Sequence, residues 1–300
     1  MTETEAIRRI RRLAVEGPAN KAVVHGIGDD CAVLRPGRNE DLVFTTDFVL
    51  QDRHFTLDTH KAADIGHKAL ARSLSDLAAM GSAPMFCLVS LAVPQELSGR
   101  WMEQFYRGLL ALAKRYSVTL AGGDLSRFQK VVVDVMCCGR VPRGKALLRS
   151  GAKVGDRVYV TGELGGSALG FATKKGAAWK RHLRPEPRIQ AGVELRRYGV
   201  SACMDLSDGL SLDLRRMCLE SGVGAALTST LPIAKRATLD HALHGGEDYE
   251  LVFTAPARRR IPPSLGTAIG SITAGVPGRV LYDGEELTAG GFDHFTQADG

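Results

Sequence analysis

DLVFTTDFVL, residues 41–50, is rich in β-branched and aromatic side chains and predicts a buried strand. The following segment, 62–80, has a helical period and stops at Gly81, a residue type that often ends helices. The pattern then predicts a strand at 85–94, a helix at 98–117 with Ser98 as its N-cap, and strands at 118–124 and 130–141. This β-α-β-α-β-β order predicts one α/β domain.

A second domain is expected beyond the segment 141–156, which is punctuated by glycine and lysine and has little hydrophobic period. A chain of 300 residues is comfortable for two domains. After this boundary we expect a loop at 181–188, a helix at 209–221, and strands at 157–162, 201–206, 249–256, 267–273 and 278–282. We therefore expect an α/β protein of the α+β type with domains 1–145 and 150–300.

Composition narrows the class of protein. Hydrophobic residues make up 44% and charged residues 24%, as in ordinary globular proteins, and no apolar run approaches a membrane span. The N-terminus lacks the apolar stretch of a secretory signal, and the six cysteines have no C-x-x-C spacing, so a cytoplasmic protein without membrane attachment is expected. The net charge of +6 is dispersed and aromatic residues are only 6%, so we do not expect a nucleic-acid partner. The basic cluster at 8–12 indicates the solvated face of an amphipathic helix.

Aspartates recur beside glycine, serine or threonine, as in HGIGDDCAV at 25–33. Each pair alone is best explained as a turn, because aspartate and glycine are both turn formers. The set is harder to explain in this way, since Asp47 lies within a strand pattern and Asp76 within an apolar helical turn. Unpaired buried carboxylates are costly, so these acids are expected to meet a cation or strong donors.

Oxygen ligands without nearby histidine or cysteine favour Mg²⁺ over zinc, and the spacing of an EF-hand calcium loop is absent. Several magnesium ions on such ligands point to a polyphosphate. The sequence has no P-loop and no protein-kinase motif pair. The glycine-rich stretch 161–170 is equally consistent with a phosphate-binding turn and with a tight strand–helix turn.

Taken together, the motifs resemble the thiamine-monophosphate kinase family, within the superfamily of aminoimidazole ribonucleotide synthetase, over about residues 25–295. They occur in that family's order: GIGDDCAVL, TTDFVLQDRHF, HKALARSLSDLAAMGSAP, AGGDLSR, LLRSGAKVGD, VTGELGGSALG, MDLSDGL, GGEDYELVFT and GFDHF.

The resemblance implies an N-terminal domain, with a mixed sheet and helices, that binds ATP and magnesium and pairs sheet edge to sheet edge in a homodimer barrel. It implies a C-terminal α/β sandwich that completes the metal and substrate site. The implied reaction moves the γ-phosphoryl group of ATP to thiamine monophosphate, which is the last step in making thiamine diphosphate.

The resemblance also assigns residues. Ligands of several magnesium ions would be Asp30, Thr45, Thr46, Asp47, Asp76, Asp124, Asp205 and Asp208. ATP contacts would be Tyr106, Gly123, Asp124, Arg149 and Ser207. The thiamine end would be held by His54, Glu247 and Phe292. The catalytic set would be Asp30, Asp47, Asp124, Asp208 and Arg149.

The chain departs from the family pattern at five positions, and none of these departures removes an implied metal ligand. Gln51 and Asp52 stand where an acid and a glycine are expected, Ser73 where asparagine is usual, Leu125 in place of threonine and Gly166 in place of aspartate. Gly166 weakens any phosphate or metal role for its loop, and Asp52 could alter the acceptor pocket. Two alternatives stay open: a superfamily relative with another acceptor, and a non-catalytic module that senses ATP or thiamine phosphate. Retention of every implied metal acid favours the enzyme.

Overall fold

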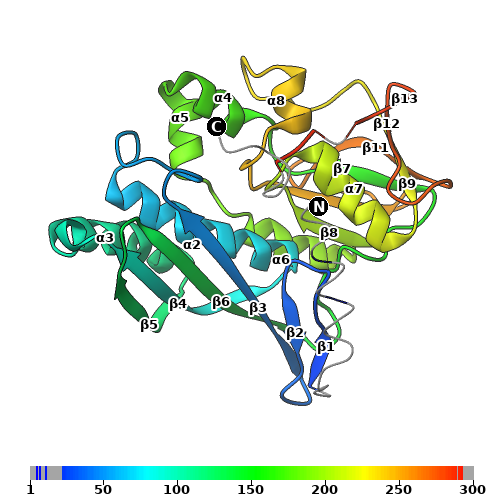
Figure 1. Ribbon diagram of the computed structural model, residues 1–300. Helices are drawn as coiled ribbons and strands as arrows, with labels where there is room; N and C mark the ends of the chain where they lie inside the picture. The colour runs from blue at the N-terminus through cyan, green and yellow to red at the C-terminus, as the bar shows by residue number, and fades with distance from the viewer. Residues whose placement is uncertain (1–4, 6, 8–10, 12–21, 289, 293–300) are drawn as a thin grey trace.

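The computed structural model describes residues 5, 7, 11, 22–288 and 290–292. It is a mixed α/β structure with two sheets, as the sequence predicted (Figure 1). The expected amphipathic helix around 8–12 lies almost entirely outside the described residues, and the ending GFDHF lies partly outside them.

The N-terminal sheet has six strands in the order β1-β2-β3-β6-β4-β5, and its neighbours are antiparallel except for the parallel pair β4–β5. Its strands are β1 (Val23–His25), β2 (Ala32–Leu34), β3 (Glu40–Leu50), β4 (Ala83–Val93), β5 (Thr119–Arg127) and β6 (Val132–Pro142). Its helices are α2 (Ala62–Ala79), the 3₁₀ turn η1 (Gln95–Leu97) and α3 (Arg100–Arg115).

The C-terminal sheet has seven strands in the order β13-β12-β9-β11-β7-β10-β8. They are β7 (Asp156–Val160), β8 (Ala202–Asp205), β9 (Gly224–Leu227), β10 (Leu251–Pro256), β11 (Thr267–Thr273), β12 (Val280–Tyr282) and β13 (Glu285–Glu286). The helices of this half are α4 (Gly166–Thr173), α5 (Gly176–Leu183), α6 (Ile189–Tyr198), α7 (Leu210–Ser221) and α8 (Leu239–His244).

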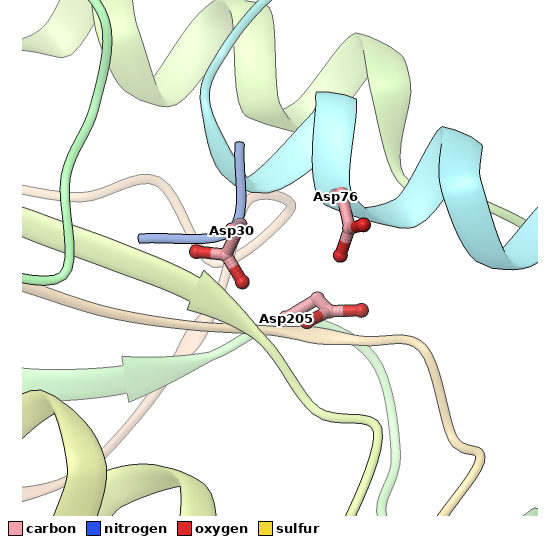
Figure 2. Close-up of side chains that lie close together, drawn as sticks. All are labelled: Asp30, Asp76 and Asp205. Atoms are coloured by element: carbon pink, nitrogen blue, oxygen red, sulfur yellow. The ribbon is translucent and has the colours of Figure 1, made fainter. Parts of the chain in front are cut away.

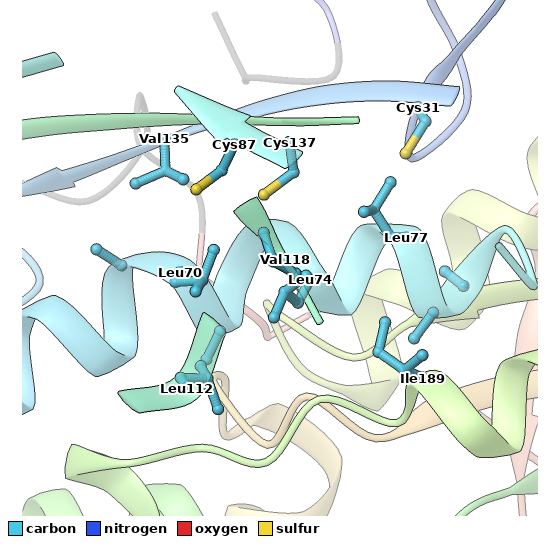
Figure 3. Close-up of a cluster of buried hydrophobic side chains, with 14 of the residues drawn as sticks. Cys31, Leu70, Leu74, Leu77, Cys87, Leu112, Val118, Val135, Cys137 and Ile189 are labelled. Atoms are coloured by element: carbon cyan, nitrogen blue, oxygen red, sulfur yellow. The ribbon is translucent and has the colours of Figure 1, made fainter. Parts of the chain in front are cut away.

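Helix α2 is the centre of the molecule, because it packs against the N-terminal sheet, against α3 and α6, and against β8 of the other sheet. Leu70, Leu74 and Leu77 of α2 are fully buried in a cluster that continues into both halves (Figure 3). A β-carbon on Gly66 would lie 2.0 Å from a backbone oxygen of α3, so α2 and α3 approach more closely than a side chain allows. Residues of α2 are therefore positioned by both halves.

Most long elements agree with the sequence predictions, but some local expectations were wrong. Ser98 does not cap α3: Gly99 is the N-cap, and the Ser98 hydroxyl donates to the carbonyl of Gln95 at 2.7 Å. The expected loop at 181–188 begins within α5. The short strands β1, β2, β9 and β13 and the helix α8 were missed, because two to six residues contain too few side chains to reveal a period.

One face of the N-terminal sheet is open. Phe48, Asp134, Ser90 and Asp124 are register partners across β3, β6, β4 and β5, so their side chains share one face. That face lies opposite the one that α2 covers, and Phe48 is 58% exposed on it. Among the described helices, none is long and apolar enough to cross a membrane.

Candidate active site

Three aspartates converge where the two sheets meet α2 (Figure 2). Asp30 comes from the turn before β2, Asp76 from α2 and Asp205 from the end of β8. One carboxylate oxygen of each lies within 4.8 Å of the other two, and we call these three residues the acidic cluster. Because the three aspartates come from widely separated segments of the sequence, no local pattern could show that they meet.

The acidic cluster has few donors of its own. The Ser75 hydroxyl donates to Asp205 Oδ2 at 2.7 Å, and the Thr45 hydroxyl donates to Asp76 Oδ2. Burial, with neighbouring carboxylates, raises the pKa of both Asp76 and Asp205 well above the usual range. A cation bound among these oxygens would offset both the cost of burial and the repulsion between the carboxylates.

Two arginines face the aspartates. Arg149 holds Asp30 in a bidentate pair, with Nη2–Oδ1 at 2.7 Å and Nε–Oδ2 at 3.2 Å. Arg216 of α7 pairs with Asp208 and also with Asp213, whose pKa is raised to about 7 by burial and by Asp208. These two guanidinium groups partly offset the negative charge of the aspartates.

Strand alternation divides the predicted ligands of β3. Thr45 and Asp47 point toward α2, whereas Thr46 points to the open face, where its hydroxyl donates to Asp134 Oδ1. Asp47 Oδ2 is buried and has no hydrogen-bond partner among the described residues. Thr45 and Asp47 therefore belong with the acidic cluster more directly than Thr46 does.

A cavity of about 720 Å³, here called the acidic cavity, joins these groups. All of the predicted metal ligands except Asp124 line it, as do Arg149, Ser207 and His54. The lining also includes Tyr249, Arg72 and Arg216, which the sequence analysis missed. These three residues were missed because arginine and tyrosine are common in helices and strands and carry no motif of their own here.

A second cavity of about 360 Å³, here called the aromatic cavity, adjoins the first and is lined by Phe171, Phe292 and His182 among others. The predicted thiamine-end residues His54, Glu247 and Phe292 all line it. The guanidinium carbon of Arg53 lies 5.1 Å from the centre of the Phe292 ring. The structure thus brings together three residues that are far apart in sequence.

Glu247 is held in place by a buried lysine. Lys68 is fully buried, and its ammonium donates to Glu247 Oε2 at 2.8 Å and lies 3.3 Å from His182 Nε2. Burial alone would raise the pKa of Glu247, but Lys68, His182 and Arg72 lower it to about 2. Glu247 therefore presents a fixed negative charge to the aromatic cavity.

The glycine-rich stretch 161–170 forms the tight strand–helix turn. The amides of Gly165 and Ser167 donate to the carboxylate of Asp248, at 2.5 and 3.0 Å. Because these donors are already used by a buried side chain, the phosphate-binding alternative is not favoured.

Tyr106, Gly123 and Asp124 are not brought to the acidic cluster within this chain. Asp124 lies on edge strand β5, three strand positions from β3 and thus roughly 14 Å away at about 4.8 Å per step. None of the three lines the acidic or the aromatic cavity. Their assignment to the ATP site remains a prediction.

Comparisons with known proteins agree with this geometry. Residues 28–141 match the N-terminal domain, and residues 153–261 the C-terminal domain, of the AIR synthase related proteins. A thiamine-monophosphate kinase from Escherichia coli strain K12 is 41% identical, with 90% of this chain and 91% of the relative covered. One from Bacillus subtilis strain 168 is 39% identical over 76% of this chain and 77% of the relative.

Solved structures give the same result. "AaThiL complexed with AMPPCP and TMP" has a TM-score of 0.87 at 31% identity and covers 98% of this chain and 97% of that one. The thiamine-monophosphate kinase from Stenotrophomonas maltophilia K279a has a TM-score of 0.77 at 37% identity, with 93% and 96% covered. The chain therefore belongs to the thiamine-monophosphate kinase family of enzymes, among the AIR synthase related proteins.

Proposed function

We propose that this protein phosphorylates thiamine monophosphate with ATP, giving thiamine diphosphate and ADP by direct in-line transfer of the γ-phosphoryl group. The observation that carries the proposal is the pair of adjoining cavities: one is lined by carboxylates, the other by aromatic rings, and both are lined by His54, Arg72, Ser207 and Asp208. A polyphosphate in the first and a ring system in the second would bring donor and acceptor phosphates together at the shared wall.

The acceptor in this reaction is a phosphate oxygen, which is already ionised at neutral pH. No general base is then needed, and catalysis reduces to positioning the reactants and balancing negative charge. Arg149 would offset charge on the donor phosphates, because its side chain lines the acidic cavity beside Asp30. This would be the last step in thiamine diphosphate synthesis, and we place it in the cytoplasm.

The donor set fits magnesium. The acidic cluster, Asp47 and Asp208 offer carboxylate oxygens, and Thr45 adds a hydroxyl oxygen. The unpartnered Asp47 Oδ2 and the raised pKa of Asp76 are what an oxygen site for a divalent cation would show without its ion. Several Mg²⁺ ions, when bound there, would supply positive charge to the ATP phosphates.

The thiamine end would be held in the aromatic cavity. Phe292 offers an aromatic face and Glu247 a negative charge, which suits a cationic or amino-bearing ring. His54 is fixed at the cavity wall, because its Nδ1 accepts from the backbone amide of Leu50 at 3.0 Å. Its role would be to shape the cavity beside the shared wall.

We further propose a homodimer paired through the N-terminal sheets, with residues 1–145 forming the dimerisation and ATP-binding domain and 150–300 completing the site. Strand β5 is an exposed edge, and Leu125 on it is 59% exposed. An exposed strand edge carries unpaired backbone groups that can pair with the edge of another chain. Such pairing would also give Tyr106, Gly123 and Asp124 a place beside bound ATP.

The proposal is tested by incubating the purified protein with ATP, Mg²⁺ and either thiamine monophosphate or free thiamine, and separating the products by ion-pair chromatography. Thiamine diphosphate formed only from the monophosphate is the expected result. Mg²⁺-dependent ATP binding without product would instead favour a relative with another acceptor, or a sensor.

A further inference from the structure

Arg72 lies where the two cavities meet. It is on the second half of α2, one helical turn before Asp76, and its side chain is 14% exposed. It lines both the acidic and the aromatic cavity. In the proposed reaction, the donor and acceptor phosphates would meet at this shared wall.

The hydrogen-bonding capacity of Arg72 is largely unused. Its Nη2 lies 3.6 Å from Asp47 Oδ1 and its Nη1 lies 3.5 Å from Glu247 Oε1. Both distances exceed the normal range for an N–H···O bond. Its Nε is buried and has no hydrogen-bond partner among the described residues.

Unpartnered buried atoms concentrate around this guanidinium. Asp47 Oδ2, Glu247 Oε1 and the hydroxyl of Tyr249 are also buried without hydrogen-bond partners among the described residues. Native proteins rarely leave buried polar groups without hydrogen bonds, so Arg72 Nε and the three unpartnered atoms of its neighbours favour a place for a polar ligand.

The neighbouring Lys68 provides a contrast. Its ammonium donates to Glu247 Oε2 at 2.8 Å and is fully buried, as expected of a structural ion pair. Glu247 therefore has a closer counter-charge in Lys68 than in Arg72. Asp47 is in turn a proposed magnesium ligand and would be occupied by metal in the working enzyme.

We propose that Arg72 binds the phosphate of the acceptor and thereby distinguishes thiamine monophosphate from unphosphorylated thiamine. The inference rests on the proposed function and assigns this residue a part in it. A planar guanidinium can donate two parallel N–H bonds to phosphate oxygens, and its charge offsets the repulsion between that phosphate, Asp47 and Glu247.

The test compares the affinities for thiamine monophosphate and thiamine by isothermal titration calorimetry, with Mg²⁺ present and ATP absent. In Arg72→Gln, the affinity for the monophosphate should fall about ten- to a hundred-fold, while that for thiamine changes less than about threefold. Arg72→Lys should recover part of the lost affinity, since lysine supplies the positive charge but not the two parallel N–H donors of a guanidinium. Arg107→Gln removes an exposed arginine of α3 and is the matched control.

The other outcomes overturn the inference in recognisable ways. An equal loss for both ligands would make Arg72 a structural residue. A loss confined to ATP, measured in a parallel titration, would place Arg72 on the donor phosphates. If Arg72→Gln does not fold, Arg72→Lys replaces it in the test. A wild-type ratio of the affinities for thiamine monophosphate and thiamine in Arg72→Lys would then overturn the inference. A wild-type protein that forms thiamine diphosphate but binds both ligands equally refutes the inference alone, whereas one that forms no product refutes the proposed function.

Discussion

The carboxylate of Glu250 is surrounded by donors, whereas those of Asp76 and Asp205 lie beside other carboxylates and accept few hydrogen bonds. Glu250 Oε2 accepts from the Thr161 hydroxyl at 2.6 Å and from Arg188 Nε at 2.7 Å, and Arg181 lies 3.2 Å from its other oxygen. In the acidic cluster, Arg149 binds Asp30, while Asp76 and Asp205 each accept from a single hydroxyl.

The difference separates an acid whose charge the fold neutralises from the acids that we propose bind metal. Burying a carboxylate costs several kcal/mol unless nearby donors replace the lost water. At Glu250 the fold supplies these donors. Asp76 and Asp205 have fewer donors, and burial beside other carboxylates therefore raises their pKa values. Under the proposed function, these carboxylates would bind a divalent cation supplied from solution.

The largest expected effect is in the acidic cluster. Asp76→Asn should lower kcat by on the order of 10³-fold, because it would remove a proposed ligand of the magnesium ions that offset charge in the transition state. It should also raise the melting temperature of the Mg²⁺-free protein, because it removes a crowded charge. Thermal denaturation with and without Mg²⁺ checks this, since the Mg²⁺-induced rise should shrink. The exposed Asp58→Asn is the control, and a variant with wild-type turnover would contradict the metal role.

Glu250→Gln should behave in the opposite way. It removes the carboxylate that pairs with Arg188 and one of the two that pair with Arg181, so the free energy of unfolding should fall by about 3–5 kcal/mol. Urea denaturation measures this loss, with exposed Glu96→Gln as the control. The Mg²⁺-induced rise in melting temperature should persist in this variant. If Glu250→Gln were as stable as the wild type, the distinction between the two kinds of buried acid would fail.

A third prediction concerns the buried cations and histidines beside Glu247. Burial, with the charge of Lys68, lowers the pKa of His60 to about 4 and that of His182 to about 3. In the unfolded chain both would take up protons near pH 6.5, so stability should fall as the pH drops below that value. Between pH 7 and 5, each should cost about 1–2 kcal/mol. Urea denaturation at several pH values should therefore show a smaller acid loss in His60→Gln, and an unchanged slope would refute the assignment.

The long elements were predictable because their hydrophobic period is clear. The helix expected at 62–80 is α2 at Ala62–Ala79, and the strand expected at 41–50 is β3 at Glu40–Leu50. The candidate site came from the family resemblance, and most of its residues do line the two cavities.

The partners of those residues were not predictable. Lys68 and Glu247 are 179 positions apart, and nothing in either segment indicates that they meet. Likewise, the glycine-rich turn at 161–170 was open to two interpretations until Asp248 was found on its amides. Local patterns specify backbone conformation, whereas pairings of this kind depend on the packing of the whole chain.

Asp52 is an exposed acid, and its replacement is expected to change the free energy of unfolding least. Asp52 stands where the family resemblance led us to expect glycine, and its φ of +65° explains that expectation, because this conformation favours glycine. Its ion pair with Lys130, at 3.0 Å, is exposed on both sides and contributes little. In Asp52→Gly, relief of strain and greater freedom of the unfolded chain should nearly cancel, leaving stability within about 0.5 kcal/mol of wild type.

Asp52→Val should instead lose about 1–2 kcal/mol, because a β-branched residue is strained at positive φ. Urea denaturation of the two variants separates the effect of backbone strain from that of the lost ion pair, since both substitutions remove the same carboxylate. Equal losses in both would show that the exposed pair with Lys130 matters after all, and that in this protein a carboxylate need not be buried to be energetically important.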